Sequence, residues 1–133
     1  MATISCEDFL IGVLCALARR GWGAVALDHN RFDIAAEAAF GVLSGIATER
    51  GLRLGFYIRR HPDYGDSTVV QDGLARMAQW SLISFDGPKY QVARIRMTPE
   101  FADRMMKGTG LDSAAFEPVV ERFVSAYENP QTA

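Results

Sequence analysis

Cysteine and histidine are scarce in this sequence, with two of each among 133 residues. Cys6 and Cys15 lie on one predicted helix, roughly 13 Å apart along its axis, which is too far for a disulfide. Both thiols have apolar neighbours and no adjacent histidine or basic residue. We therefore expect them to be buried and unreactive.

The histidines, His29 and His61, fall in predicted loops, and no second histidine or cysteine lies at metal-ligand spacing. A phosphate-binding loop is also missing, because Gly108-Thr109-Gly110 lacks the following Gly-Lys-Ser/Thr and comes after a predicted helix. We interpret it as a connector between helices. The sequence thus predicts no metal site, no cofactor and no catalytic residue, so we expect a protein that is not an enzyme.

Long apolar runs are absent, since no stretch approaches the roughly 18 residues that a membrane-spanning helix needs. Glu7 and Asp8 stand where a secretory signal would carry Lys or Arg. These two features predict a protein that is not exported and does not engage a membrane, and the two cysteines without a disulfide fit a reducing cytoplasm.

A strong positive charge is lacking too, because the formal net charge is -2. The charge is nevertheless uneven. Residues 1–50 carry four Arg and six acids, residues 51–107 nine Lys or Arg and six acids, and residues 108–133 one Arg and four acids. The basic middle permits nucleic-acid binding without the dense basic stripe that is typical of strong phosphate binders.

The sequence does contain an ordered series of elements in one domain, residues 1–128, before a flexible polar tail, residues 129–133. Periodicity and capping residues predict helices over residues 5–20, 33–50, 66–80, 98–108 and 112–128, and strands over 52–59, 81–85 and 90–97. The last two strands form a hairpin around a turn at residues 86–89. The expected fold is α+β and mostly helical, with a two- to three-stranded antiparallel sheet and flanking helices.

The ends of the first two helices have local signals. Ser5 is expected to cap the first helix, Asp33 to cap the second, and Gly51 to end the second. Within the second helix, Gly41 and Gly45 leave little side-chain bulk, which predicts the close approach of another element. A core crossing is the first interpretation, and a ligand or partner helix that uses the Gly41-x-x-x-Gly45 groove is the second.

Residues 65–107 resemble a winged-helix domain. In that class a helix is followed by a turn of glycine-leucine-isoleucine type, a two-stranded wing and a helix that starts with leucine-threonine-proline-glutamate-glycine. Here Trp80-Ser81-Leu82-Ile83 and Met97-Thr98-Pro99-Glu100-Phe101 stand in those places, and both depart from the pattern.

Phe56-Tyr57 and Tyr64-Gly65-Asp66-Ser67 also resemble the approach to this helix in the SocA-like, or Panacea, antitoxin-associated family. That family has a proline at the position of Asp66. The resemblance implies a module that grips protein partners, in some members with DNA binding by appended domains.

One hypothesis for function is a DNA-binding transcriptional regulator, in which the helix at residues 67–80 enters a groove and the wing contacts phosphates. The candidate residues are Arg59, Arg60, Gln71, Arg76, Lys89, Arg94 and Arg96. Few of them lie on the helix itself, and Asp72 on that helix would repel phosphate. We therefore rank DNA binding second.

The first-ranked hypothesis is protein recognition by a non-catalytic module, such as an antitoxin-like protein, a mobile-element inhibitor or a regulator. The last helix carries an apolar stripe with aromatic anchors, namely Phe116, Val120, Phe123 and Tyr127. Such a stripe either binds a partner, which includes a second copy in a homodimer, or completes the core of its own domain.

Overall fold

The computed structural model describes residues 3–87, 89, 91–107 and 113–130. In these residues the α-helices are α1 (Cys6–Arg19), α2 (Arg31–Arg50), α3 (Thr68–Gln79), α4 (Pro99–Lys107) and α5 (Ser113–Glu128). The strands are β1 (Thr3–Ile4), β2 (Ala24–Ala26), β3 (Arg53–Leu54), β4 (Ile83–Asp86) and β5 (Val92–Ile95), and η1 (Asp28–Asn30) is a short 3₁₀ helix. The predicted α+β class is confirmed. The helix boundaries expected at Gly108 and Asp112, the tail beyond residue 130 and parts of the hairpin turn lie outside the described residues.

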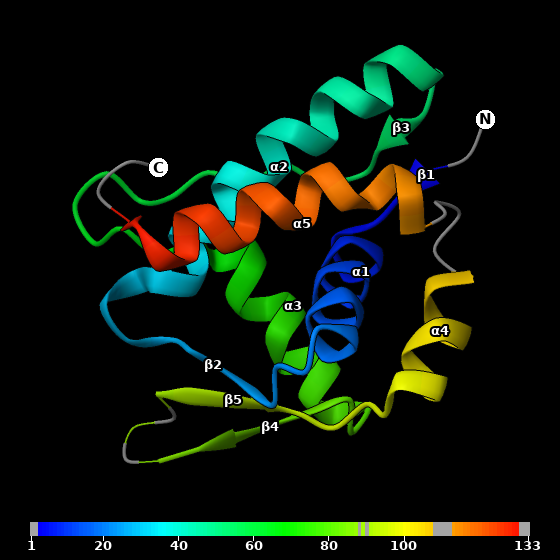
Figure 1. Cartoon of the computed structure of the whole chain (residues 1–133). Coiled ribbons are helices and arrows are strands. Elements are labelled where there is room, and N and C mark those ends of the chain that lie inside the picture. Colours follow the sequence, from blue (N-terminus) through cyan, green and yellow to red (C-terminus); the bar gives the residue numbers. More distant parts are fainter. Residues whose placement is uncertain (1–2, 88, 90, 108–112, 131–133) are drawn as a thin grey trace.

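Helix α1 is the centre of the molecule, and α3, α4 and α5 pack around it (Figure 1). The predicted cap is present: the Ser5 hydroxyl accepts from the Asp8 amide, and the Asp8 carboxylate accepts from the Ser5 amide. Close packing depends on Gly12, where an added Cβ would lie 2.7 Å from the Phe116 ring. Most of the α1 surface is therefore buried, as its apolar content predicts.

Helices α2 and α5 lie side by side over α1 (Figure 1), and the Phe32 and Phe123 rings meet at a centroid distance of 5.2 Å. Two expectations for α2 are wrong. The helix begins at Arg31, so Asp33 is a buried residue of its first turn and not its cap. Gly41 and Gly45 face solvent with open space around them, because buried alanines form the close-packed side of α2 instead.

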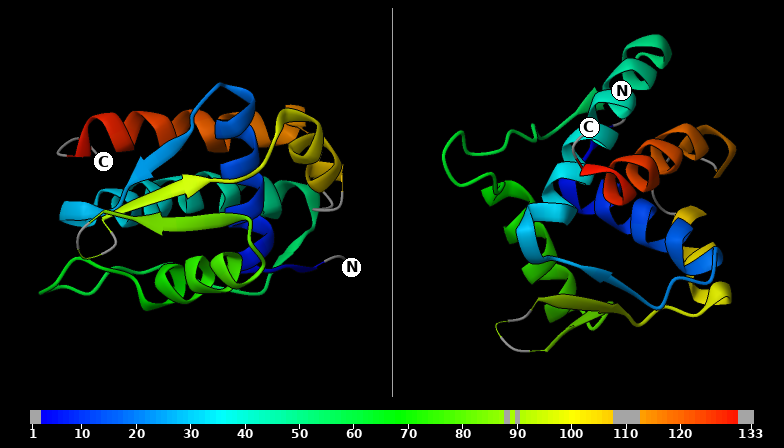
Figure 2. Two further views of the ribbon diagram at one scale, coloured as in Figure 1. Left: turned by 90° about the horizontal axis from the view of Figure 1, so that it is seen from below. Right: turned by 60° about the vertical axis from the view of Figure 1, so that its left-hand side comes forward.

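The larger sheet has the antiparallel order β2-β5-β4. The hairpin of β4 and β5 was predicted, and β2 adds a third strand that pairs Val25 with Ala93. The helices cover one face of this sheet and leave the other face open (Figure 2, left). None of the helices in the described part of the chain combines the length and the apolar character needed to cross a membrane.

Helices α1, α2 and α3 end in the same way. Gly21, Gly51 and Ser81 each adopt a left-handed backbone, with φ of 87°, 67° and 62°. The amide of the next residue donates to a carbonyl five positions back in each case, for example from Leu82 to Met77. In the resemblance to winged-helix domains, Ser81 stands where the turn of glycine-leucine-isoleucine type has its glycine.

The prediction of one strand over residues 52–59 is largely wrong. Strand β3 spans Arg53–Leu54 and pairs in parallel with β1. The pairing stops there because β1 ends at Ile4, where Ser5 turns the chain into α1. Side chains nevertheless continue to alternate between buried and exposed as far as Arg59.

The apolar stripe of α5 completes the core of its own domain. Phe116, Val120 and Phe123 are fully buried, so they do not form an exposed partner surface on this chain. Tyr127 is half-buried: its hydroxyl accepts from the Ala26 amide at 2.7 Å, and its ring contacts Trp22 and Arg31. Of the two roles expected for this stripe, burial of these residues supports completion of the core.

Candidate functional site

Large apolar side chains that remain exposed are concentrated in one part of the sequence. Among the described residues they are Tyr57, Tyr64, Val69 and Trp80, with exposed fractions of 68%, 75%, 38% and 53%. All four belong to residues 55–80, from the end of β3 to the residue after α3. Tyr57 and Val69 also line one groove, and exposed apolar side chains that lie together are typical of a binding surface.

A shallow groove of about 340 Å³ lies beside Tyr57 and Val69, and we call it the α3 groove. Its walls come from the start of α1 (Ser5, Cys6 and Glu7), from the segment after β3 (Gly55, Phe56 and Tyr57) and from α3 (Val69, Asp72, Gly73 and Arg76). Gly73 lets α3 approach α1 closely, since a Cβ there would lie 2.5 Å from Leu10 Cδ1.

The charged side chains of the α3 groove partly neutralise one another. The Arg76 guanidinium forms an ion pair with Glu7. Burial raises the pKa of the Cys6 thiol to about 12, so this thiol stays protonated at neutral pH and is not a nucleophile. The groove therefore offers apolar contacts and hydrogen bonds and has no reactive group.

The segment that forms one wall, residues 55–59, has an unusual backbone. The Gly55 amide donates to Ile4 O at 2.9 Å, which is the last contact with β1. Beyond it, the backbone groups of Phe56, Tyr57, Ile58 and Arg59 form no hydrogen bond with any described residue. The Phe56 ring is packed between Phe9 and Phe40, so the segment is fixed by its side chains.

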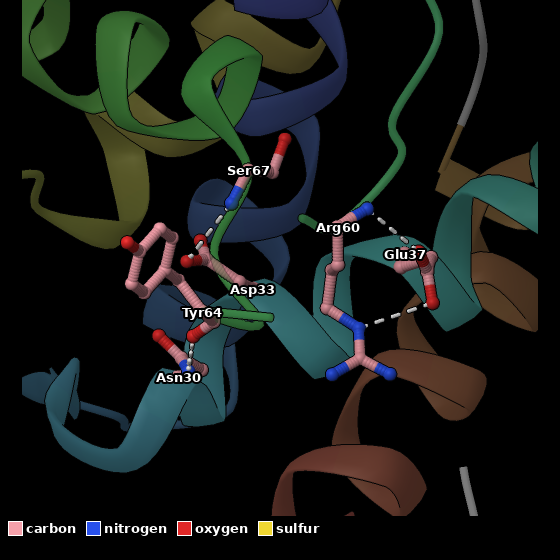
Figure 3. Close-up of polar contacts among 6 residues, drawn as sticks. All are labelled: Asn30, Asp33, Glu37, Arg60, Tyr64 and Ser67. Atoms are coloured by element: carbon pink, nitrogen blue, oxygen red, sulfur yellow. Dashed lines mark hydrogen bonds and ion pairs between the residues drawn. The ribbon is translucent and has the colours of Figure 1, made fainter. Parts of the chain in front are cut away.

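Polar contacts with α2 hold the chain where it returns toward α3 (Figure 3). Glu37 accepts from the Arg60 amide and from its Nε at 3.0 and 3.1 Å. Asn30 Nδ2 donates to Tyr64 O at 2.6 Å. The loop between β3 and α3, which projects from the rest of the chain (Figure 2, right), is thus held at Arg60 and Tyr64 by contacts with α2 and its N-cap.

Asp33 anchors the start of α3 in the same network. Its carboxylate accepts from the Ser67 amide at 3.4 Å and from Gln71 Nε2 at 3.0 Å, and the Ser67 hydroxyl caps α3 by accepting from Val70 N. Burial raises the pKa of Asp33 to about 6. Since the hydrogen bonds of Asp33 all go to this one helix start, we assign it a structural role.

The residues predicted to bind nucleic acid do not form one free basic patch. Arg60, Arg76 and Arg94 are paired with Glu37, Glu7 and Asp86, Gln71 is bonded to Asp33, and Arg96 donates to Ser84. Arg59 and Lys89 are exposed and have no ion pair with a described residue. Intramolecular carboxylates therefore neutralise much of the charge that the sequence hypothesis assigned to phosphates.

The histidines take part in turn structure. His61 Nδ1 accepts from the Asp63 and Tyr64 amides at 3.1 and 3.2 Å, and exposed His29 lies 3.6 Å from Asp28. No group of three or more His, Cys, Asp or Glu residues in the described ranges is arranged to hold a metal ion.

Comparison of this chain with family models, curated proteins and solved structures found no match. Its function is therefore inferred from the residues of the surface itself. Sequence reasoning missed this surface as a site, although the alternation that placed Tyr57 on the outer side of the predicted strand was a usable signal.

Proposed function

We propose that the chain is a non-catalytic protein-recognition module whose binding surface is the α3 groove with its exposed rim, Tyr57 and Val69. The observation that carries this proposal is that two of the exposed large apolar side chains, Tyr57 and Val69, line one groove. Exposed apolar side chains beside an arginine that is already paired, Arg76 with Glu7, favour a protein partner over a polyanion.

The winged-helix-like unit is the scaffold in this proposal, because α3, the hairpin and α4 follow one another in the order that the resemblance implies. The resemblance to antitoxin-associated proteins that grip protein partners also favours protein recognition, and we include that resemblance in the proposal. An antitoxin, a mobile-element inhibitor and a small regulator all fit such a module.

DNA binding is the alternative, and Arg59 and Lys89 are the exposed cations that favour it. Two features weigh against groove reading by α3. Asp72 is exposed on the helix, and residues 51–67 connect α2 to α3 where a helix-turn-helix has a turn of about three or four residues.

The experiment compares two kinds of probe. Random-sequence duplex DNA is titrated at about 50 and 200 mM salt, with an Arg94→Ala/Arg96→Ala variant in parallel. Random peptides displayed on phage are then selected on the purified chain. We expect no saturable DNA binding. We also expect the selected peptides to bind the wild type at least about tenfold more tightly than the Val69→Asp variant, because the substitution removes one central apolar contact.

Ala114→Asp is the matched control, because it places the same charge on an exposed site of α5 and should leave peptide affinity unchanged. Salt-sensitive DNA binding that the double variant loses would overturn the proposal in favour of DNA. Peptides that bind Val69→Asp as well as the wild type would show that the α3 groove is not the surface.

A further inference from the structure

The segment at residues 55–59 has the pattern of a strand and lacks a strand partner. Its side chains alternate between exposed and buried: Tyr57 and Arg59 are exposed, and Phe56 and Ile58 turn toward the core. Alternation with a period of two is the signature of a β-strand with one buried face. The sequence predicted a strand here for this reason.

The place of the missing partner can be located. Strand β1 pairs with β3 and would continue alongside residues 55–57, but Ser5 starts α1 at that point. The α3 groove opens at this position, between residues 55–57, the first turn of α1 and α3. The groove therefore lies where the next residues of a neighbouring strand would run.

We infer that the α3 groove is a strand-addition site, in which an extended segment of a partner protein pairs with the backbone of Phe56 and Tyr57 in the groove and continues beyond it along Ile58 and Arg59. Unpaired backbone donors and acceptors on an exposed edge are the groups that such peptides bind. The inference rests on the proposed function and specifies how the partner is held.

The charges at this edge identify the chemistry of the segment. Arg53, Tyr57 and Arg59 project from the exposed side, and Arg59 has no ion pair with a described residue. Side chains that lie opposite each other on paired strands attract when their charges differ. The segment should thus carry an acidic residue opposite Arg59, with small or apolar side chains alternating toward Val69 and Gly73.

A second copy of this chain is a poorer occupant of the same edge. Two copies that paired edge to edge along residues 56–59 would bring the Arg59 side chains of both chains into one short strand pair. Like charges directly opposite each other destabilise a strand pair. The acidic side chains near the groove do not relieve this repulsion, because Glu7 is paired with Arg76 and Asp72 lies on the far wall.

The test uses a peptide from the phage selection, with each of its amides N-methylated in turn. Strand addition predicts that N-methylation weakens binding at every second position, because alternate amides face the protein. It also predicts that bound peptide slows hydrogen exchange of amides within residues 56–59. Neither measurement requires a variant of the protein that could fail to fold.

The charge prediction has a matched pair of variants. Arg59→Glu should weaken binding of the peptide at least about tenfold. Lys107→Glu, the same reversal of charge at an exposed site on α4, should change affinity less than about twofold. Selected peptides without acidic residues, or equal effects of both variants, would overturn the acidic preference.

The outcomes separate the inference from the proposed function. Peptides that depend on Val69 but show no alternation and no protection at residues 56–59 would overturn strand addition and leave protein recognition standing. Peptides that do not depend on Val69 would overturn both. A dimer on sizing whose formation protects these same amides would make the occupant a second copy and overturn the partner assignment.

Discussion

Asp33 is a carboxyl group whose ionisation opposes folding. Burial is the main reason that its pKa rises from 3.8 to about 6, nearby Asp66 acts in the same direction, and Gln71, Ser67 and Arg60 act against it. The folded chain therefore binds a proton that the unfolded chain has released between about pH 4 and 6. Asp33 therefore raises the free energy of unfolding most below pH 4, and this contribution is lost as the pH rises through 6.

Replacing Asp33 with Asn should remove this dependence. The amide keeps an oxygen for Ser67 and Gln71 and carries no charge, so we expect Asp33→Asn to be more stable than the wild type at pH 8, by about 1–3 kcal/mol, and similar at pH 4. Urea unfolding from pH 4 to 8 measures the difference. A constant difference across this range would contradict a raised pKa.

Ser81 occupies a backbone conformation that costs a residue with a Cβ about 1 kcal/mol. The equivalent positions after α1 and α2 carry Gly21 and Gly51. We expect Ser81→Gly to raise the free energy of unfolding by roughly 0.5–1 kcal/mol and Ser81→Val to lower it. Thermal unfolding of both variants checks the direction, and a destabilised glycine variant would show that the serine side chain matters more than its backbone.

At the scale of elements, glycines inside helices have two different roles. Gly12 in α1 touches the Phe116 ring, whereas Gly41 in α2 faces open space. We expect Gly12→Ala to destabilise the fold by about 1–3 kcal/mol through overpacking, and Gly41→Ala to stabilise it by up to about 1 kcal/mol through helix propensity. Denaturant unfolding of the two variants compares one chemical change in two environments; equal effects would rule out the close contact at Gly12.

Local signals predicted the elements whose ends are decided locally. Ser5, Ser67 and Thr98 each accept a hydrogen bond from an amide three residues ahead, so α1, α3 and α4 begin where the sequence indicates. The hairpin followed from its turn residues. In contrast, the three-residue strand β2 was missed because its pairing with β5 is not encoded near Ala24.

Features that depend on distant parts of the chain could not be predicted. A strand at residues 52–59 needs a neighbour, and the length of β1 is decided by the cap of α1. Aspartate is a residue type that often caps helices, which is why the sequence predicted that role for Asp33. Its actual position depends on hydrogen bonds with Ser67 and Gln71 at the start of another helix. The same holds for the groove, whose walls come from three separate segments.

At the scale of the whole molecule, α5 is part of the core. Phe123 is fully buried and its ring contacts Phe32 and Tyr127. We expect Phe123→Asp to destabilise the chain by more than about 4 kcal/mol, because it buries an unpaired charge. Circular dichroism should show loss of structure; a folded variant with altered oligomeric state would instead support a partner surface on α5. Ser125→Asp, on the exposed side of α5, is the control.

The open backbone at residues 56–59 also bears on the solubility of the free protein. An unpaired strand edge is a template for aggregation, and charged side chains along it are a common protection. Arg53 and Arg59 provide that protection here. We expect Arg53→Thr/Arg59→Thr to scatter light at concentrations where the wild type stays clear; the same result from Arg50→Thr/Lys107→Thr would assign the effect to overall charge instead.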